Sequence, residues 1–327
     1  MLTLTDYQKL DRDMIVQAIY DWIFQTDSGF LQKLAVNTVK GNGIKYNIKT
    51  ERAGVSFQDP EDDIPETTPK IEQRSAAIYL AIKDCYLLKW AKETNATQDP
   101  WALQMKSDVE DFVAAINQML VLGQTTTKGN TKQPKGMLRL IAELESELTT
   151  DLDGVNNSQV IANHATSGAL DQNKFDELID AVERPNFLMM SKRARRKLNT
   201  LIRASGSIVR IEQPELGKFV QFYNEIPIFI NTNIPDNLDD NSSSVCNIAA
   251  WDAAQARGSG DDNTLIFCGR AMDESGFCIN QAIPITQEPV GTHQKKDVEI
   301  RRIKWYYGHA AYDKYSLAVL TGVNPDE

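Results

Sequence analysis

The sequence predicts an α+β fold with a sizeable hydrophobic core. Three patterns support this prediction. One long amphipathic helix is punctuated at both ends, period-two alternation precedes it, and short helices and strands are mixed after it. The chain has 327 residues, of which 42% are hydrophobic. That length permits two domains or one elaborated domain.

The charge balance indicates a soluble protein. The chain has 35 basic and 45 acidic residues, giving a net charge of −10. An acidic chain is disfavoured as a tight wrapper of nucleic acid, although local basic patches are possible. Asp6, Asp11 and Asp13 precede any apolar run, unlike the start of a signal peptide. No apolar run is long enough to span a bilayer, so we expect no membrane partner.

The cysteines indicate a cytosolic setting. They are scattered without any C-x-x-C pair, and a chain of this size needs no disulfide framework. We therefore expect reduced thiols at Cys85, Cys246, Cys268 and Cys278.

Residues 14–34 have the spacing of an amphipathic helix. Its apolar face comprises Ile15, Ala18, Ile19, Trp22, Ile23 and Phe24. Two interpretations stay open: the helix packs on its own domain, or it is an arm that packs on a neighbouring subunit.

Between Val36 and Ile82 the pattern changes to the alternation of strands. One strand is expected around Ile44, Tyr46 and Ile48, and a second would carry Ile71, Ala77, Tyr79 and Ala81. A two-stranded ribbon is only marginally stable alone in water. We therefore expect this ribbon to lean on something else, most simply a neighbouring subunit.

The segment between these strands, residues 57–69, is rich in proline and acid. It has too few apolar residues to bury a core of its own. Its carboxylates, from Asp59 to Glu66, lack the spacing of a calcium loop. A solvated loop tip is therefore favoured over a metal site.

Residues 100–122 are predicted to form a long helix that acts as a spine. Asp99 suits the N-cap and Pro100 the first helical position, and Gly123 ends the helix. Its length would be roughly 35 Å at 1.5 Å per residue. The apolar stripe comprises Met105, Val109, Phe112, Val113, Ile116, Met119 and Leu120. Its expected packing partner is the final strand around Ile300, Trp305 and Tyr307.

The loop after this helix superficially resembles a phosphate-binding loop. However, Lys128 precedes Gly129 instead of following it, and the loop follows a helix instead of a strand. Nucleotide binding is therefore not favoured.

Short helices and strands alternate in the following part of the chain. Helical spacing covers residues 137–148 and 171–182, and strands are expected at 187–190, 208–211, 218–223, 226–230, 264–268 and 276–279. Pro227 indicates an edge strand or a strand start.

Ser191 caps an expected basic helix over residues 192–202. Its cations are Lys192, Arg193, Arg195, Arg196 and Lys197. No aromatic residues interleave with them for base stacking, so a solvated or salt-bridged face is favoured over a nucleic-acid reader. Contacts between subunits are equally compatible with this charge.

The sequence shows no catalytic, metal or cofactor motif. His164, His293 and His309 have no metal-like spacing with the cysteines, and no nucleophile elbow or dinucleotide fingerprint occurs. We therefore expect no enzyme activity, no cofactor and no metal.

Five features occur in order along the chain. They are the amphipathic segment 14–34, the acidic hairpin 41–75, the spine helix running into Leu122-Gly123 and Pro134-Lys135-Gly136-Met137-Leu138, the Phe187-Leu188-Met189-Met190-Ser191 step, and the run Tyr307-Gly308-His309-Ala310-Ala311-Tyr312-Asp313 closing on Leu320-Thr321-Gly322-Val323. In this order they resemble the major capsid proteins of tailed bacteriophages, which have the Hong Kong 97 type fold.

The resemblance implies a domain plan. It gives an N-terminal arm (1–40), an extended loop (41–75), a peripheral domain in two parts (76–134, with the spine helix 100–122, and 288–327), and an axial α/β domain (135–287). The extended loop would reach over a neighbouring subunit.

The resemblance also implies a function. Copies would form hexamers and pentamers that close into an icosahedral shell around double-stranded DNA, which is held without sequence-specific contacts. Assembly would occur in the cytoplasm of a host bacterium, and the protein would end in the virion capsid. Because the arm begins almost at Met1, a separate scaffolding protein is expected, together with a portal and, in some arrangements, a decoration protein.

Candidate site residues follow from this plan. The expected inter-subunit contacts are Trp22, Phe57, Asp62, Asp63, Glu66, Arg193 and Arg196, and the expected lumen-facing cations are Lys295, Lys296, Arg301 and Arg302.

Two alternatives remain. One is an encapsulin, a protein compartment with the same fold that holds an enzyme; the arm and the long acidic hairpin favour the phage interpretation over it. The other is a soluble α/β enzyme with an unrecognised site, which predicts a small oligomer and a deep polar pocket.

Overall fold

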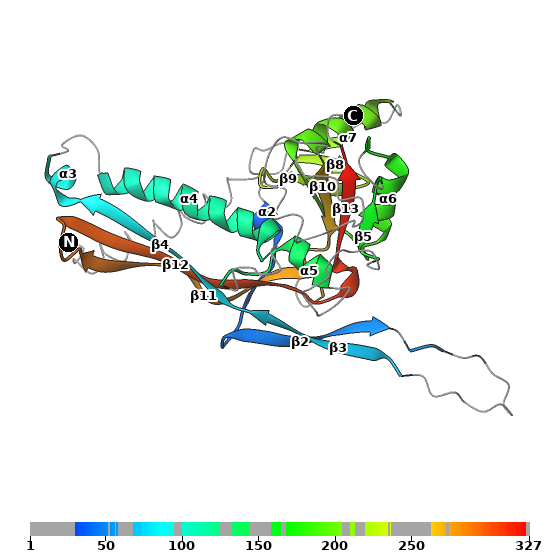
Figure 1. Ribbon diagram of the computed structural model, residues 1–327, viewed down its shortest axis with the longest axis horizontal. Helices are drawn as coiled ribbons and strands as arrows, with labels where there is room; N and C mark the ends of the chain where they lie inside the picture. The colour runs from blue at the N-terminus through cyan, green and yellow to red at the C-terminus, as the bar shows by residue number, and fades with distance from the viewer. Residues whose placement is uncertain are drawn as a thin grey trace.

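The computed structural model describes residues 30–51, 53–55, 57, 68–94, 100–124, 132–143, 158–164, 168–204, 210–212, 220–234, 236, 263–272 and 275–324. These residues form three parts (Figure 1). The spine lobe is a four-stranded sheet with one long helix on it. The round lobe is a seven-stranded sheet with helices on it. The hairpin is a two-stranded ribbon that projects from their junction.

The sheet of the spine lobe has the strand order β1-β11-β12-β4. Its strands are β1 (Val36–Thr38), β4 (Tyr79–Leu88), β11 (Phe277–Thr292) and β12 (Val298–Ala311). β11 and β12 form a long antiparallel pair, β4 is antiparallel to β12, and β1 is parallel to β11. The short helices α2 (Phe30–Lys33) and α3 (Lys89–Thr94) flank this sheet.

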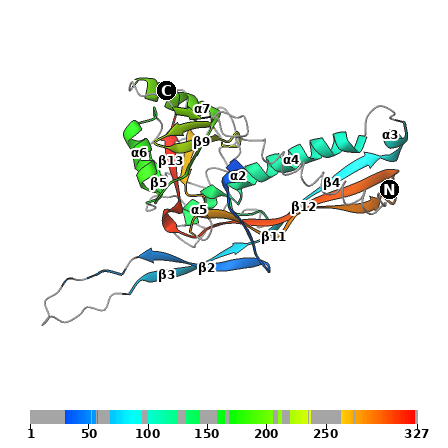
Figure 2. The same cartoon turned by 180° about the vertical axis from the view of Figure 1, so that it is seen from behind.

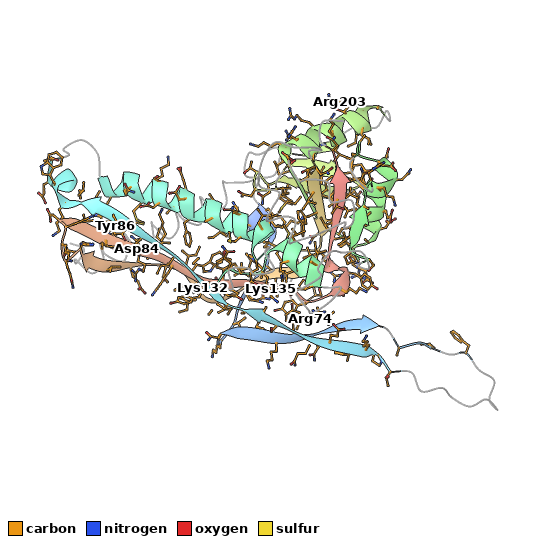
Figure 3. All side chains as sticks on the ribbon, in the orientation of Figure 1. Arg74, Asp84, Tyr86, Lys132, Lys135 and Arg203 are labelled. Atoms are coloured by element: carbon orange, nitrogen blue, oxygen red, sulfur yellow. The ribbon has the colours of Figure 1, made fainter. Side chains whose placement is uncertain are left out.

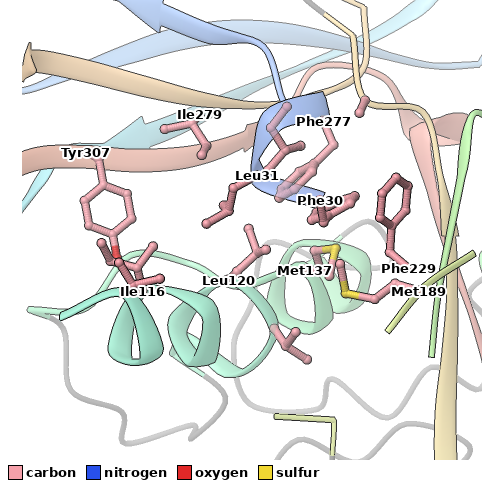
Figure 4. Packing of buried hydrophobic residues seen from close by; sticks show 14 of the residues in the cluster. Phe30, Leu31, Ile116, Leu120, Met137, Met189, Phe229, Phe277, Ile279 and Tyr307 are labelled. Carbon is pink, nitrogen blue, oxygen red and sulfur yellow. The ribbon is translucent and has the colours of Figure 1, made fainter. Parts of the chain in front are cut away.

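The spine helix α4 runs from Pro100 to Leu122, with the bounds that its flanking proline and glycine predict. Six of the seven residues of its apolar stripe are buried in one cluster with Ile303, Trp305 and Tyr307 of β12, which confirms the expected partner strand. Met119 is only half-buried and is outside this cluster. Figure 4 shows Tyr307 pointing toward Ile116. Ile300 is outside this cluster. Because side chains alternate along a strand, Ile300 points to the opposite face of the sheet from Ile303.

The connection from α4 to α5 (Met137–Glu143) is closed at its base. The backbone N–H of Gly136 donates to the carbonyl of Gly123 at 2.8 Å. A Cβ on Gly123 would collide with the carbonyl oxygen of Pro134, and one on Gly136 would lie 2.6 Å from the carbonyl oxygen of Val121. Two close backbone approaches therefore require glycine. The helix expected to continue to Leu148 is described only as far as Glu143.

The sheet of the round lobe has the order β5-β13-β10-β6-β9-β8-β7. The strands are β5 (Val160–Ala162), β6 (Phe187–Met190), β7 (Arg210–Glu212), β8 (Val220–Tyr223), β9 (Ile226–Ile230), β10 (Thr264–Gly269) and β13 (Leu317–Val323), and a 3-10 turn, η2 (Lys314–Ser316), precedes β13. The helices α6 (Gln172–Asp180) and α7 (Lys192–Ala204) contribute Phe175 and Leu198 to a cluster with one face of this sheet. The other face joins the cluster that contains α4 and α5.

Two details refine the sequence-based expectations. The second strand expected through Tyr79 is broken at Ile78, because β3 pairs with β2 whereas β4 pairs with β12. β9 lies between β6 and β8, so of the two positions expected for Pro227 the edge strand is excluded and the strand start is confirmed. Pro227 is tolerated near its start, because pairing of β9 with β6 begins only at Ile228.

The sheets also divide the chain differently from the expected domains. The expected boundary at residues 287 and 288 falls inside β11, which belongs to the spine lobe along its whole length. The expected final segment, 288–327, contributes β12 to the spine lobe and β13 to the round lobe. The first residues of β11 are buried in the same way as β10, so apolar content alone does not distinguish the two sheets.

The hairpin consists of β2 (Gly43–Glu51) and β3 (Lys70–Ala77), paired from Gly43↔Ala77 to Glu51↔Lys70. Figure 2 shows the ribbon extending away from both lobes. The helix expected over 14–34 lies outside the described residues except for its end, where α2 buries Phe30 and Leu31 against the core.

Candidate assembly surfaces

The root of the hairpin is fixed to the spine lobe by small apolar and aromatic side chains. Ala76 of β3 packs with Cys278 and Ala310. The rings of Tyr46 and Tyr312 meet edge-on at a centroid distance of 4.8 Å. Burial, reinforced by the nearby charge of Glu143, raises the pKa of Tyr46 to about 12. The root is therefore a rigid base for the rest of the ribbon.

A polar pocket of about 330 Å³ lies beside this root, lined by Lys45, Gln73, Arg74, Ser75, Lys135 and Glu143. Figure 3 shows Arg74 and Lys135 at this junction. Glu143 accepts from Lys135 Nζ at 2.8 Å and from Arg139 Nε at 2.9 Å. These ion pairs tie α5 to the loop before it, at the point where the hairpin leaves the body.

The part of the hairpin farther from the root has little packing. Ile71 is 59% exposed, and Phe57, beyond the end of β2, is 96% exposed. An isolated two-stranded ribbon is at best marginally stable in water. The exposed apolar residues at this end indicate that another surface covers it.

The face of the spine-lobe sheet that points away from α4, here called the outer sheet face, is unusually apolar. On β4 it carries Leu80, Ile82, Tyr86 and Leu88, all 45–58% exposed, and Ile283 of β11 joins them. A solvated face of an antiparallel sheet is normally polar. Contiguous exposed apolar side chains mark an interaction surface.

Ion pairs interrupt this apolar face. Arg302 donates two hydrogen bonds to Asp84, at 2.6 and 2.9 Å. The hydrogen bonds from Arg302 hold the pKa of Asp84 below its usual range. Lys304 pairs with Glu288 at 2.5 Å one step along the sheet. These pairs are self-contained, so they add polarity to the face without leaving net charge.

The helices of the round lobe carry opposite charge. α7 has six basic residues and no acidic one, whereas α6 carries Asp176, Glu177 and Asp180 with a single base, Lys174. Figure 1 shows α7 along the top of the lobe and α6 along its side. The lobe therefore presents a positive and a negative surface in different directions.

No protein-family model matches the sequence, and no curated protein sequence matches it either. Solved structures do match. The SrpI encapsulin of Synechococcus elongatus gives a TM-score of 0.62 at 13% identity, covering 90% of this chain and 86% of the encapsulin. The capsid of an empty GTA particle gives 0.60 at 13% identity, with coverages of 89% and 88%. The structure titled Microbacterium phage Oxtober96 gives 0.56 at 12% identity, with coverages of 90% and 91%.

The chain has the Hong Kong 97 type capsid fold. The sequence resemblance predicts a peripheral domain, an axial domain and an extended loop, and the spine lobe, the round lobe and the hairpin are the candidates for these three parts. The match covers nearly the whole chain, so the α+β architecture expected from the sequence is confirmed.

The structure describes three of the seven residues expected at contacts between subunits. Phe57 is almost fully exposed near the far end of the hairpin. Arg196 is exposed on α7 and Arg193 is partly buried. Trp22, Asp62, Asp63 and Glu66 lie outside the described residues.

The four expected lumen-facing cations do not share one surface. Lys295 and Lys296 are exposed in the turn between β11 and β12. Arg301 lies over the ring of Trp101, 4.5 Å from its centroid, on the α4 side of the sheet. Arg302 points to the outer sheet face. Neighbouring residues on a strand face opposite ways, so Arg301 and Arg302 lie on opposite faces of the sheet.

Sequence reasoning missed the outer sheet face. The alternation through Tyr79 and Ala81 identified one face of β4, but Leu80 and Ile82 between them are apolar as well. A strand that is apolar on both faces is expected to be covered on both faces, and this was the available signal.

Other kinds of site are not seen in the described part of the chain. No group of three or more His, Cys, Asp or Glu side chains there is arranged to hold a metal ion. Among the same residues, no helix is both long enough and apolar enough to cross a membrane.

Proposed function

We propose that this protein is the major capsid protein of a tailed bacteriophage. Its copies assemble as hexamers and pentamers into an icosahedral shell that encloses double-stranded DNA. The capsid fold supports a capsid-like shell protein, and two incomplete surfaces on the single chain support self-assembly in particular.

The observation that carries the proposal is the pairing of an unsupported ribbon with an uncovered apolar sheet. The hairpin exposes Ile71 and Phe57, and the outer sheet face exposes Leu80, Ile82, Tyr86 and Leu88. In the shell, the hairpin of one copy lies on the outer sheet face of the next. Each apolar surface is then removed from water, which stabilises the contact by about 25 cal/mol per Å² of apolar surface buried.

The geometry of this contact favours a closed shell over a dimer. The hairpin and the outer sheet face are different surfaces, so the contact is heterologous and leaves a free surface of each kind on every pair. Heterologous contacts generate rings when the rotation closes. Rings of five and six copies then close the shell.

The genome is held by confinement and not by base contacts. A chain of net charge −10 binds phosphate weakly overall. Lys295, Lys296 and one of Arg301 and Arg302 offset phosphate repulsion where they face the lumen. A separate scaffolding protein, a portal and, in some particles, a decoration protein are the further partners, and assembly takes place in the cytoplasm of the host bacterium.

An encapsulin-type compartment is the second candidate. The likeness to the SrpI encapsulin, at a TM-score of 0.62, favours it specifically. Neighbouring genes separate the two functions: terminase and portal genes accompany a phage capsid, whereas a cargo enzyme gene accompanies an encapsulin.

Electron microscopy of the purified protein tests the proposal. Closed shells, or rings of five and six subunits, are expected at high protein concentration with a scaffold supplied. A persistent monomer or dimer under these conditions would overturn it and would favour the soluble α/β enzyme. Nuclease-protected duplex DNA inside particles made during infection distinguishes the phage capsid from the encapsulin.

A further inference from the structure

Each of the two surface helices of the round lobe places charge against its own dipole. Five of the six cations of α7 lie within residues 192–197, in its first two turns. α6 ends on Asp180, close to Glu177, and has no basic residue in its last turn. Cations at a helix N-terminus and anions at a C-terminus are each unfavourable by a few tenths to about 1 kcal/mol. Both helices therefore carry charges that oppose their dipoles.

Local ion pairs do not remove the cost on α7. Within the described residues, no ion pair involves Lys192, Arg196 or Arg203. Lys192 and Arg196 are one helical turn apart and both exposed, and like charges at this spacing repel. Arg203 continues the positive face to the other end of the helix, where Figure 3 shows its side chain.

α6 has the complementary pattern. Within the described residues, Glu177 forms an ion pair with Lys174 alone, at 2.6 Å, and this exposed pair contributes little to stability. Asp180 is exposed and takes part in no ion pair within the described residues. The C-terminal half of α6 is thus a negative surface at the negative end of a helix dipole.

Among the described residues, no ion pair joins α6 to α7 within one chain. The turn after α6 leads into β6. The backbone N–H of Asn186, the residue before β6, donates to the carbonyl of Gly269. α7 begins at Lys192, just beyond its other end. Four strand residues span about 13 Å, which exceeds the Debye length of about 8 Å at physiological ionic strength.

We propose that the N-terminal half of α7 in one copy docks on the C-terminal half of α6 in the next copy of this chain. Lys192 and Arg196 then face Glu177 and Asp180 of the neighbour. Lys192 and Arg196 are four residues apart, about 6 Å along α7, and Glu177 and Asp180 are three residues apart, about 4.5 Å along α6. The spacings are similar enough for each cation to face one anion. The contact is heterologous and repeats around a ring. It rests on the proposed shell function and names the surfaces that join the round lobes within one hexamer or pentamer.

Charge reversal tests the contact. One variant carries Lys192→Glu with Arg196→Glu, and a second carries Glu177→Lys with Asp180→Lys. The reversed charges are exposed, so circular dichroism and the unfolding midpoint should match wild type. Like charges brought together across an interface cost several kcal/mol, so each variant should need more than tenfold higher concentration for ring formation. The matched control, Lys40→Glu with Lys106→Glu, reverses two exposed cations outside these helices and should form rings at the wild-type concentration.

Combining the two sets of substitutions gives a sharper test. All four substitutions in one chain restore opposite charge at every contact and should restore rings and shells. A mixture of the two double variants should assemble only in alternation, so it should give six-membered rings and no five-membered ones. Electron microscopy and light scattering against concentration measure both effects.

The outcomes separate the two proposals. If wild-type protein forms no rings under any condition, the shell function and this contact both fail. If wild type forms rings and both double variants do so equally well, only the contact fails. Rings that survive the Lys192 and Arg196 reversal, while the protein loses affinity for duplex DNA, would also overturn it and would assign α7 to nucleic acid.

Discussion

The Nδ1 atom of His309 lies 2.8 Å from the backbone carbonyl oxygen of Lys135. A carbonyl oxygen only accepts, so Nδ1 carries the proton and donates. Nε2 is buried and has no hydrogen-bond partner within the described residues. Burial lowers the pKa of His309 to about 4. A neutral imidazole therefore joins the start of α5 to β12, at the junction of the two lobes.

The first prediction is loss of stability at mildly acid pH. Because the folded-state pKa is below the unfolded value of about 6.5, the unfolded chain takes up a proton first as pH falls. The contribution of His309 to the free energy of unfolding is therefore fully present above about pH 6.5. It falls by about 3 kcal/mol in all as the pH is lowered toward 4. Urea unfolding of the subunit from pH 7.5 to 4.5 measures the slope.

Two variants assign that slope to His309. His309→Gln keeps a side-chain donor and removes the titration, so its stability should change less with pH in this window. His293→Gln, at an exposed position, should keep the wild-type slope. Equal slopes in all three proteins would contradict the assignment.

The second prediction concerns the close approach of Gly123 and Gly136. Gly123→Ala and Gly136→Ala should each destabilise the subunit by more than about 2 kcal/mol, because the new Cβ meets backbone atoms that cannot move independently. Thermal unfolding measures the change. Ala114→Ser, on the exposed side of α4, is the control and should stay within about 0.5 kcal/mol. A tolerated alanine at both glycines would show that the connection opens easily.

The third prediction separates assembly from folding on a single strand. Leu88 is on the outer sheet face and its neighbour Leu87 is in the core, 7% exposed. Leu88→Thr should leave the unfolding free energy nearly unchanged and raise the concentration needed for assembly. Leu87→Thr should instead cost the subunit about 2 kcal/mol or more. Denaturant titration and light scattering read the two effects. Equal destabilisation by both would mean that the outer face is part of the fold of one chain.

The fourth prediction concerns the far part of the hairpin. Deleting Gly54 to Pro69 leaves Arg52 and Ala53 as a two-residue link between Glu51 and Lys70, which are already paired. The deleted chain should stay soluble and folded, with an unchanged unfolding midpoint, yet form no stable shells in electron micrographs. Loss of the folded subunit would show instead that the hairpin belongs to the core.

Helix-bounding residues and the periodicity of apolar residues were enough to predict the local elements. Pro100 and Gly123 bound α4, and its stripe of apolar residues identified the strand on which it packs. The expected helices and strands of the round lobe recur with shifts of a few residues, and α6, α7, β6, β9 and β10 each have buried residues that the apolar spacing reveals.

Long-range placement was not predictable in the same way. The break at Ile78 depends on which partner each half of the strand finds. The outer sheet face depends on the sheet's other side being already filled by α4. The opposed charges of α6 and α7 become informative only when β6 is seen to hold them apart, since their sequence separation says nothing of distance.

The placement of β13 has a consequence for how the protein is made. This strand lies between β5 and β10 in the interior of the seven-stranded sheet, and it is parallel to β5 and antiparallel to β10. Every other described strand leaves the ribosome before β13, so the round lobe of a nascent chain has an open slot until β13 emerges. Long-range pairing of this kind is slow to form. We therefore expect the seven-stranded sheet to be completed late in folding.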